Sequence, residues 1–227
     1  MSVATTIHRE NSFWENYFTV RTWILFAFSC VAYALVLHIQ QKYVLTEQVY
    51  YNTLGEQLTI ERIDAFLQKQ REWSWLSYAL IPAVLFVQAL LVSICLATGA
   101  ILLDYRIKFG RLLGMVIKAS VVYAIGKLVY MTAIQFTEVQ TIEDLAKADI
   151  FSLLGWVGAE TVPTWLHYPL SVVNVFELGF WILLAGGMGY LLEKRWARML
   201  AFVAATYGVG LLVWVLFIVF LQLNLFH

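Results

Sequence analysis

Lys127, Asn174 and Glu177 have the best claim to chemistry in this 227-residue chain, because each is a charged or amide group inside a long apolar stretch. Burying such groups in lipid is expensive, so they normally face a bundle interior or an aqueous cavity and find partners. We expect an intramembrane ion pair between Lys127 and Glu177, with Asn174 as an additional hydrogen-bond partner. The plainer interpretation is a pair that fixes helix register; the alternatives are a proton or solute pathway and a contact with another subunit.

A further lysine, Lys118, precedes Lys127 by nine residues. At 3.6 residues per turn, this spacing puts the two on opposite sides of one helix. We expect Lys118 to extend its ammonium group to the nearby cytoplasmic interface.

Five long apolar stretches must position these residues. Hydrophobic residues make up 61% of the chain and charged residues 13%, whereas soluble domains carry roughly 25% charged residues. A helix that crosses a hydrocarbon core of about 30 Å needs about 20 apolar residues. The predicted fold is therefore all-α, a polytopic membrane protein with five transmembrane helices, at residues 23–39, 75–103, 112–134, 165–192 and 197–226.

Positive charges predict the orientation of these spans. Six of the 15 lysines and arginines lie at two very short turns, and both turns belong to the side that holds the N terminus: Arg106, Lys108, Arg111, Lys194, Arg195 and Arg198. Short basic turns stay in the cytoplasm. We therefore expect a cytoplasmic N terminus and a C terminus on the far side.

Three segments outside the spans have their own patterns. Residues 1–22 contain a capping-box pattern at 12–15 and predict a short cytoplasmic interfacial helix. Residues 40–74 predict an amphipathic helix after Thr59, whose apolar stripe packs on the membrane, packs on the second far-side connection or binds a partner. That connection, residues 135–164, contains an apolar stretch that we expect at the interface.

Small residues recur at four-residue spacing in the last two spans. Ala185 and Gly189 form one such pair, and Ala204 and Gly208 form another. This spacing lets membrane helices approach closely, so we expect these residues at helix contacts.

Motifs of catalysis and cofactor binding are not recognisable in the chain. The four histidines are scattered, and Cys30 and Cys95 lie within spans without clustered metal ligands, so we expect no catalytic residues, cofactor or metal. There is no basic patch for nucleic acid. The partners we expect are the lipid bilayer and another membrane protein or a second copy of this chain.

The stretch WLHYPLSVVNVFEL at residues 165–178, preceded by Asp144-Leu145 and by Phe151-Ser152-Leu153-Leu154, resembles an uncharacterised bacterial family of five-span proteins, broadly similar to Yip-type membrane proteins. The resemblance covers about the last two-thirds of the chain. It implies a bacterial inner-membrane location and an accessory role, and it supplies no catalytic residues.

These patterns predict a non-enzymatic integral membrane subunit or scaffold of a larger membrane complex. The alternative is a small transporter or ion-coupled channel that uses Lys127, Asn174 and Glu177. Five spans without a visible internal repeat argue against the transporter.

Overall fold

The chain is an all-α protein with five helices that are long and apolar enough to cross a membrane. The computed structural model describes residues 17–55, 58–135, 140–142, 144–147 and 149–225. Within those ranges the only extended pairing is an isolated bridge between Ser152 and Asn174. The candidate spans are Thr22–Val44, Ser74–Leu102, Phe109–Ile134, Val175–Leu192 and Trp196–Asn224. Their length and composition indicate a membrane protein with transmembrane helices.

The helices follow one another with short connections. Their bounds are α2 (Thr22–Ile39), the π-helix η1 (Gln40–Val44), α3 (Glu47–Leu54), α4 (Ile60–Glu72), α5 (Ser74–Leu102), α6 (Phe109–Ala119), α7 (Val121–Ile134), α8 (Asp144–Lys147), α9 (Leu153–Val157), the 3-10 helix η2 (Ala159–Thr161), α10 (Thr164–Val172), α11 (Val175–Leu192), α12 (Trp196–Val203), the π-helix η3 (Ala204–Gly208) and α13 (Val209–Leu225).

Two spans differ from the predicted ones by more than three residues at one end. The first does not end at Ile39, because η1 continues it to Val44. The continuous span predicted over 165–192 is wrong: it is two helices, α10 and α11, separated at Val173 and Asn174. The apolar residues on both sides of the break hide it from a hydropathy pattern.

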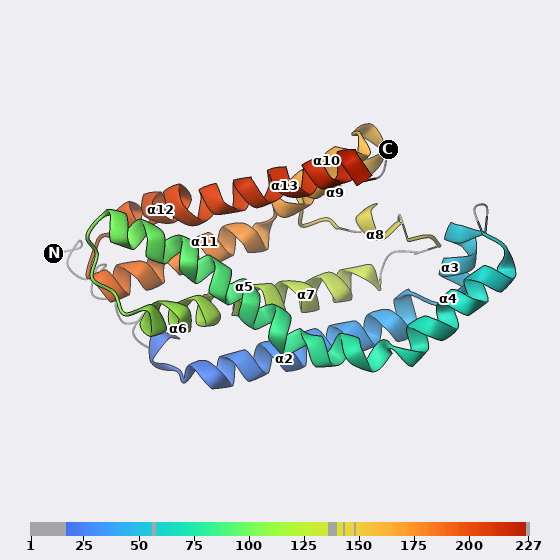
Figure 1. The fold of residues 1–227 in the computed structure, drawn as a ribbon, viewed down its shortest axis with the longest axis horizontal. Coiled ribbons are helices and arrows are strands. Elements are labelled where there is room, and N and C mark those ends of the chain that lie inside the picture. The colour runs from blue at the N-terminus through green and yellow to red at the C-terminus, as the bar shows by residue number, and fades with distance from the viewer. Residues whose placement is uncertain (1–16, 56–57, 136–139, 143, 148, 226–227) are drawn as a thin grey trace.

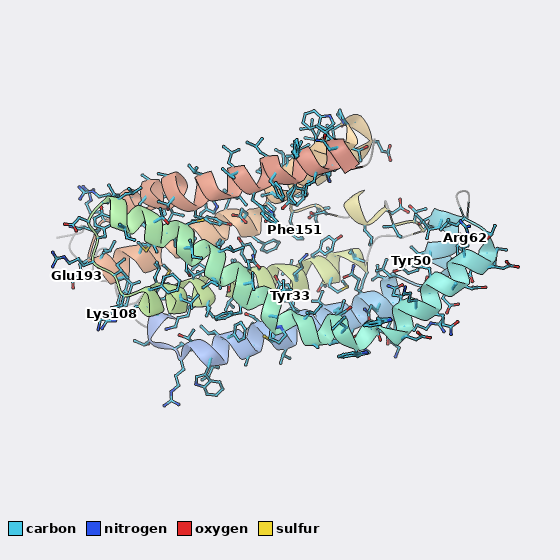
Figure 2. The ribbon with its side chains drawn as sticks, in the orientation of Figure 1. Tyr33, Tyr50, Arg62, Lys108, Phe151 and Glu193 are labelled. Atoms are coloured by element: carbon cyan, nitrogen blue, oxygen red, sulfur yellow. The ribbon has the colours of Figure 1, made fainter. Side chains whose placement is uncertain are left out.

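The bundle has two unlike ends (Figure 1). The α5–α6 and α11–α12 turns lie together at one end, where Lys108 and Glu193 are labelled in Figure 2. At the other end the α3–α4 hairpin extends beyond the remaining helices, and α5 crosses the bundle obliquely between the two ends. The basic turns are therefore on one side of the molecule.

The principal core lies toward the end with the short turns. It joins α5, α6, α11 and α12, and its fully buried side chains include Leu96, Leu112, Val116, Leu184, Met188, Met199 and Val203. A smaller cluster between α2 and α7 contains Val36, Met131 and Ile134. The α3–α4 half of the molecule thus has less buried apolar surface.

The predicted helix after Thr59 is α4. It buries Ile63 and Leu67 against Tyr50 of α3 and leaves Ile60 and Phe66 exposed. The hairpin is joined to the second far-side connection, since the Ile142 amide donates to Thr53 Oγ1 at 3.0 Å. Packing on that connection therefore accounts for part of the apolar stripe.

The predicted interfacial helix over 1–22 falls mostly outside the described residues. Of its described part, Phe18 is buried in the principal core, and Tyr17 donates through its hydroxyl to the Lys118 carbonyl oxygen at 2.6 Å. The Lys118 ammonium donates in turn to the Phe18 carbonyl oxygen. Lys118 is therefore bound to the segment that enters the first span.

Candidate functional site

The break between α10 and α11 is a built junction. Asn174 is extended and caps α11, since its Oδ1 accepts from the Glu177 amide at 2.8 Å. Its Nδ2 donates to the carbonyl oxygens of Ser171 and Val172, at the end of α10. In apolar surroundings an unpaired backbone group is costly, so one asparagine serves both helix ends.

A second chain segment completes the junction. The Leu153 amide donates to the Val173 carbonyl oxygen at 2.9 Å, and the Val175 amide donates to the Phe151 carbonyl oxygen at 3.1 Å. The α8–α9 connection therefore folds back to the break and pairs with it. This pairing brings Asp149, just before the paired residues, close to the third span.

The Glu177 carboxylate is held by three neutral donors. Its Oε2 accepts from the Tyr123 hydroxyl at 2.6 Å. Its Oε1 accepts from the Tyr207 hydroxyl at 2.7 Å and from the Trp181 indole N–H at 2.8 Å. Three donors from α7, α11 and η3 converge on one carboxylate, so this cage fixes the Glu177 side chain between these helices.

Local helix geometry places these donors. Trp181 is one turn after Glu177 on α11, where i and i+4 side chains meet. Tyr207 lies in η3, the short π-helix inside the fifth span. Such π-bulges in α-helices reorient side chains and are frequent at functional sites. Gly208 lets the Trp181 ring pack against η3, because a Cβ at position 208 would lie 2.7 Å from Trp181 Cη2.

A cavity of about 470 Å³ adjoins this cage, and we call it the bundle cavity. It lies between α2, α7 and the junction, and its wall includes Tyr33 (labelled in Figure 2), Tyr123 and Phe176. Its polar lining residues come from five different segments: Gln40 of η1, Gln88 of α5, Lys127 of α7, Asp149 and Asn174. An aqueous or ligand-filled space inside an otherwise apolar bundle fits this lining.

Two opposite charges in the bundle cavity have no side-chain partner in the described part of the chain. Neither the Lys127 ammonium nor the Asp149 carboxylate forms a hydrogen bond or ion pair there; the ion pair that the described residues do contain joins Arg71 and Glu47. Charged groups in apolar surroundings normally pair or reach water. Lys127 is exposed and Asp149 is half-buried, so both can reach water or a bound solute.

The predicted ion pair between Lys127 and Glu177 is wrong. Tyr123 reaches Glu177, and Lys127 lies one helical turn further along α7. The prediction assumed a continuous fourth span, in which Glu177 would be several turns deep. The break instead puts Glu177 in the first turn of α11, beside Tyr123. Of the three predicted residues, Asn174 and Glu177 are hydrogen-bonded neighbours, while Lys127 shares the bundle cavity with Asn174.

The predicted small residues lie on α11 and η3. Ala185 is fully buried, and a Cβ on Gly189 would be 3.2 Å from the Lys194 carbonyl oxygen. Ala204, the first residue of η3, is partly buried, and Gly208 is the last residue of the same element. A closer approach occurs at Gly187, whose Cβ would be 2.5 Å from Met115 Cγ. Close packing thus extends to a glycine that the four-residue spacing did not select.

Several site residues were not predicted from the sequence: Gln40, Gln88, Tyr123, Asp149, Trp181 and Tyr207. One signal was present. Asn174 and Glu177 have the Asn-x-x-Glu spacing of a helix N terminus, which marks the break. Tyr123 and Tyr207, as phenols inside spans, also need acceptors, but only the fold shows that they share one.

Metal chemistry finds no support in the described ranges, where no three His, Cys, Asp or Glu side chains gather as ligands. Comparisons with protein-family models, with curated proteins and with solved structures give no match. The Yip-like resemblance therefore stays a prediction, and functional inference depends on the site itself.

Proposed function

We propose that this chain is a non-enzymatic membrane protein that binds a small solute of both charge signs in the bundle cavity and moves it across the bilayer. One observation supports the proposal: Lys127 and Asp149, which are unpartnered in the described structure, line the same cavity. A zwitterion offers an anionic group to Lys127 and a cationic group to Asp149. Amide side chains of Gln40 and Gln88 can hydrogen-bond the rest of such a solute.

The size of the cavity and the broken helix agree with this proposal. About 470 Å³ lies within the range of small-molecule sites, roughly 300–1,000 Å³. Many transporters place their substrate where a membrane helix is interrupted, since the interruption frees polar groups at depth. The junction of α10 and α11 at Asn174 has this character. The missing internal repeat is the observation that still argues against transport.

Thermal unfolding of the detergent-purified protein tests solute binding. The probes are alanine, glutamine and glycine betaine as zwitterions, with acetate and choline as singly charged controls. A ligand at a concentration about 100 times its dissociation constant stabilises a protein by about 2.7 kcal/mol. We expect only zwitterions to raise the melting temperature, and a solute that does so should then enter liposomes that contain the protein.

Two lysines of the same span supply a matched comparison. Lys127→Met should weaken solute binding about tenfold or more, because a hydrogen bond to a charged group contributes about 1.5–3 kcal/mol. Lys118→Met should lower stability without changing that affinity. Unchanged affinity in Lys127→Met, or no shift with any probe, would reject the proposal.

A subunit or scaffold role is the second candidate. It is favoured by the α3–α4 hairpin, which extends beyond the spans and exposes Ile60 and Phe66 (Figure 1). Gentle detergent purification followed by mass spectrometry tests it. A stoichiometric partner that is lost from the double variant Ile60→Ser, Phe66→Ser, but not from Ile94→Ser in a span, would favour the scaffold.

For location we propose a bacterial inner membrane with the N terminus in the cytoplasm and the C terminus on the far side. The clustering of the basic turns at one end of the bundle supports this orientation. Cysteines introduced at Lys108 and Arg195 should be labelled by impermeant reagents only from the cytoplasm, and one at Gln68 only from outside. The reverse pattern would overturn it.

A further inference from the structure

A second cavity lies where the first two spans leave the apolar region. Its volume is about 510 Å³, and it lies between the end of η1, the α3–α4 hairpin and the start of α5. The first span ends at Val44 and the second begins at Ser74, so the cavity is level with a membrane surface. We call it the interfacial cavity.

Exposed aromatic side chains mark the same level. Tyr43, Trp73 and Trp75 are 66%, 55% and 63% exposed. Such exposure is unfavourable in water, whereas amphipathic rings are favoured among lipid headgroups. The interfacial cavity therefore opens among headgroups.

The cavity lining combines an apolar floor with both charge signs. Leu45, Tyr50 and Leu67 supply apolar surface. Lys42 supplies an ammonium whose other contact is the Tyr43 ring, 5.3 Å from its centroid. A phosphate group would find a cation here, and a glycerol backbone would find apolar contact.

The ion pair between Arg71 and Glu47 completes the lining. It joins α4 to α3 and is solvent-accessible, with side chains 69% and 59% exposed. A guanidinium has five N–H donors, so Arg71 retains donors for a phosphate while it holds Glu47. Glu47 uses one oxygen for Arg71, and its second oxygen can accept from an ammonium group.

We propose that the interfacial cavity binds the headgroup of a zwitterionic phospholipid that carries a primary ammonium, of the phosphatidylethanolamine type. Lys42 and Arg71 bind its phosphate, and Glu47 accepts hydrogen bonds from its ammonium group. The floor of Leu45 and Leu67 contacts the glycerol end. The lipid thereby fixes the α3–α4 hairpin to the span ends, independently of any solute in the bundle cavity.

Native mass spectrometry of the delipidated full-length protein tests this proposal. The probes are phosphatidylethanolamine, phosphatidylcholine and diacylglycerol with the same acyl chains, together with glycerophosphoethanolamine and inorganic phosphate. We expect phosphatidylethanolamine to be retained best, because a quaternary amine offers no N–H donor to Glu47. Diacylglycerol should be retained least.

Variants separate the cavity from general surface charge. Lys42→Gln should lower phosphatidylethanolamine retention about tenfold, and Glu47→Gln should remove the preference over phosphatidylcholine. Lys69→Gln, an equal loss of charge on α4 outside the cavity, should change neither. Equal retention of diacylglycerol, an equal effect of Lys69→Gln, or equally strong binding of inorganic phosphate would overturn the headgroup assignment.

Discussion

The two lysines of the third span have opposite surroundings. The Lys118 ammonium donates to the Phe18 carbonyl oxygen beside the principal core. Lys127, nine residues further along the chain, has no partner among the described residues and lines the bundle cavity. The same residue type therefore joins two segments at one end of the bundle and remains available to a ligand in the other half.

Two carboxylates repeat this contrast. Glu177 accepts from Tyr123, Tyr207 and Trp181, whereas the Asp149 side chain has no partner in the described part of the chain. Polar groups that are fully hydrogen-bonded specify packing, and unsatisfied ones are costly unless water or a ligand is present. The contrast teaches that polar groups within the apolar helices are of two kinds: some are satisfied inside the fold, and others are left to water or a ligand.

The largest effect should come from removing the partnered carboxylate. Glu177→Leu should lower the free energy of unfolding by about 3–5 kcal/mol, since three donors lose their acceptor at about 1–3 kcal/mol each with some rehydration. Chemical unfolding in detergent measures it. Glu61→Leu is the control, because Glu61 is an exposed acid in the first turn of α4; its loss should cost no more than about 1 kcal/mol. Equal losses would contradict the cage.

Overpacking the end of the bundle that holds the principal core, here called the dense end, should have the next largest effect. A Cβ on Gly99 would lie 2.0 Å from Thr206 Cγ2, between α5 and η3. Gly99→Ala should therefore lower the free energy of unfolding by about 1–3 kcal/mol. Gly110→Ala is the matched control, because nothing lies within 4 Å of its added Cβ. If both variants keep the wild-type stability, the contact between α5 and η3 is less tightly packed than the structure shows.

Removing the unpartnered lysine should have little effect on folding. Lys127→Met should change the free energy of unfolding by less than about 1 kcal/mol, because no protein hydrogen bond is lost. Combined with Glu177→Leu, its effect should add to within about 0.5 kcal/mol, as expected for sites without a shared partner. A double-mutant cycle in detergent measures this. Recovery of stability in the double variant would instead show that Lys127 and Glu177 interact as an ion pair.

The sequence predicted the spans and the helix after Thr59 because these depend on apolar length and on a local stripe. The basic turns were equally readable, since they lie between adjacent spans. The break at Asn174 was missed because valine, phenylalanine and leucine around it read as one continuous span. Hydropathy does not register a single capping residue, although the Asn174–Glu177 spacing carried that information.

The site residues needed tertiary structure. Asp149 is far from Lys127 in sequence, and the pairing of 151–153 with 173–175 brings its segment to the cavity. Tyr207 reaches Glu177 from η3, and a short π-helix has no reliable sequence pattern. Ion pairing between Lys127 and Glu177 was predicted from depth along ideal helices, and one interrupted helix was enough to change the neighbours of both charges.

The smallest expected effect is a shift in the pKa of one of two tyrosines outside the spans, Tyr17 and Tyr51, which lie at opposite ends of the molecule. Burial raises the pKa of the Tyr17 hydroxyl to about 12 at the dense end. At the other end the hydrogen bond that the Tyr51 hydroxyl donates to Asp64 is the main cause that raises the pKa of Tyr51 above its ordinary 10.0. A raised pKa means that the protonated phenol stabilises the fold below pH 10, and that this contribution is lost as the pH rises through the raised value.

Asp64→Asn should therefore lower the pKa of Tyr51 and leave the pKa of Tyr17 unchanged, because the amide removes a negative charge from one environment only. Ultraviolet difference titrations of the wild type, Tyr17→Phe and Tyr51→Phe, each with and without Asp64→Asn, assign the two phenols. Glu61→Gln, an equal charge change on α4, is the control and should move neither midpoint. Tyr17 depends on packing that a distant charge does not alter, whereas Tyr51 depends on a single exposed acceptor, so a shift of both midpoints would show that the two ends are coupled.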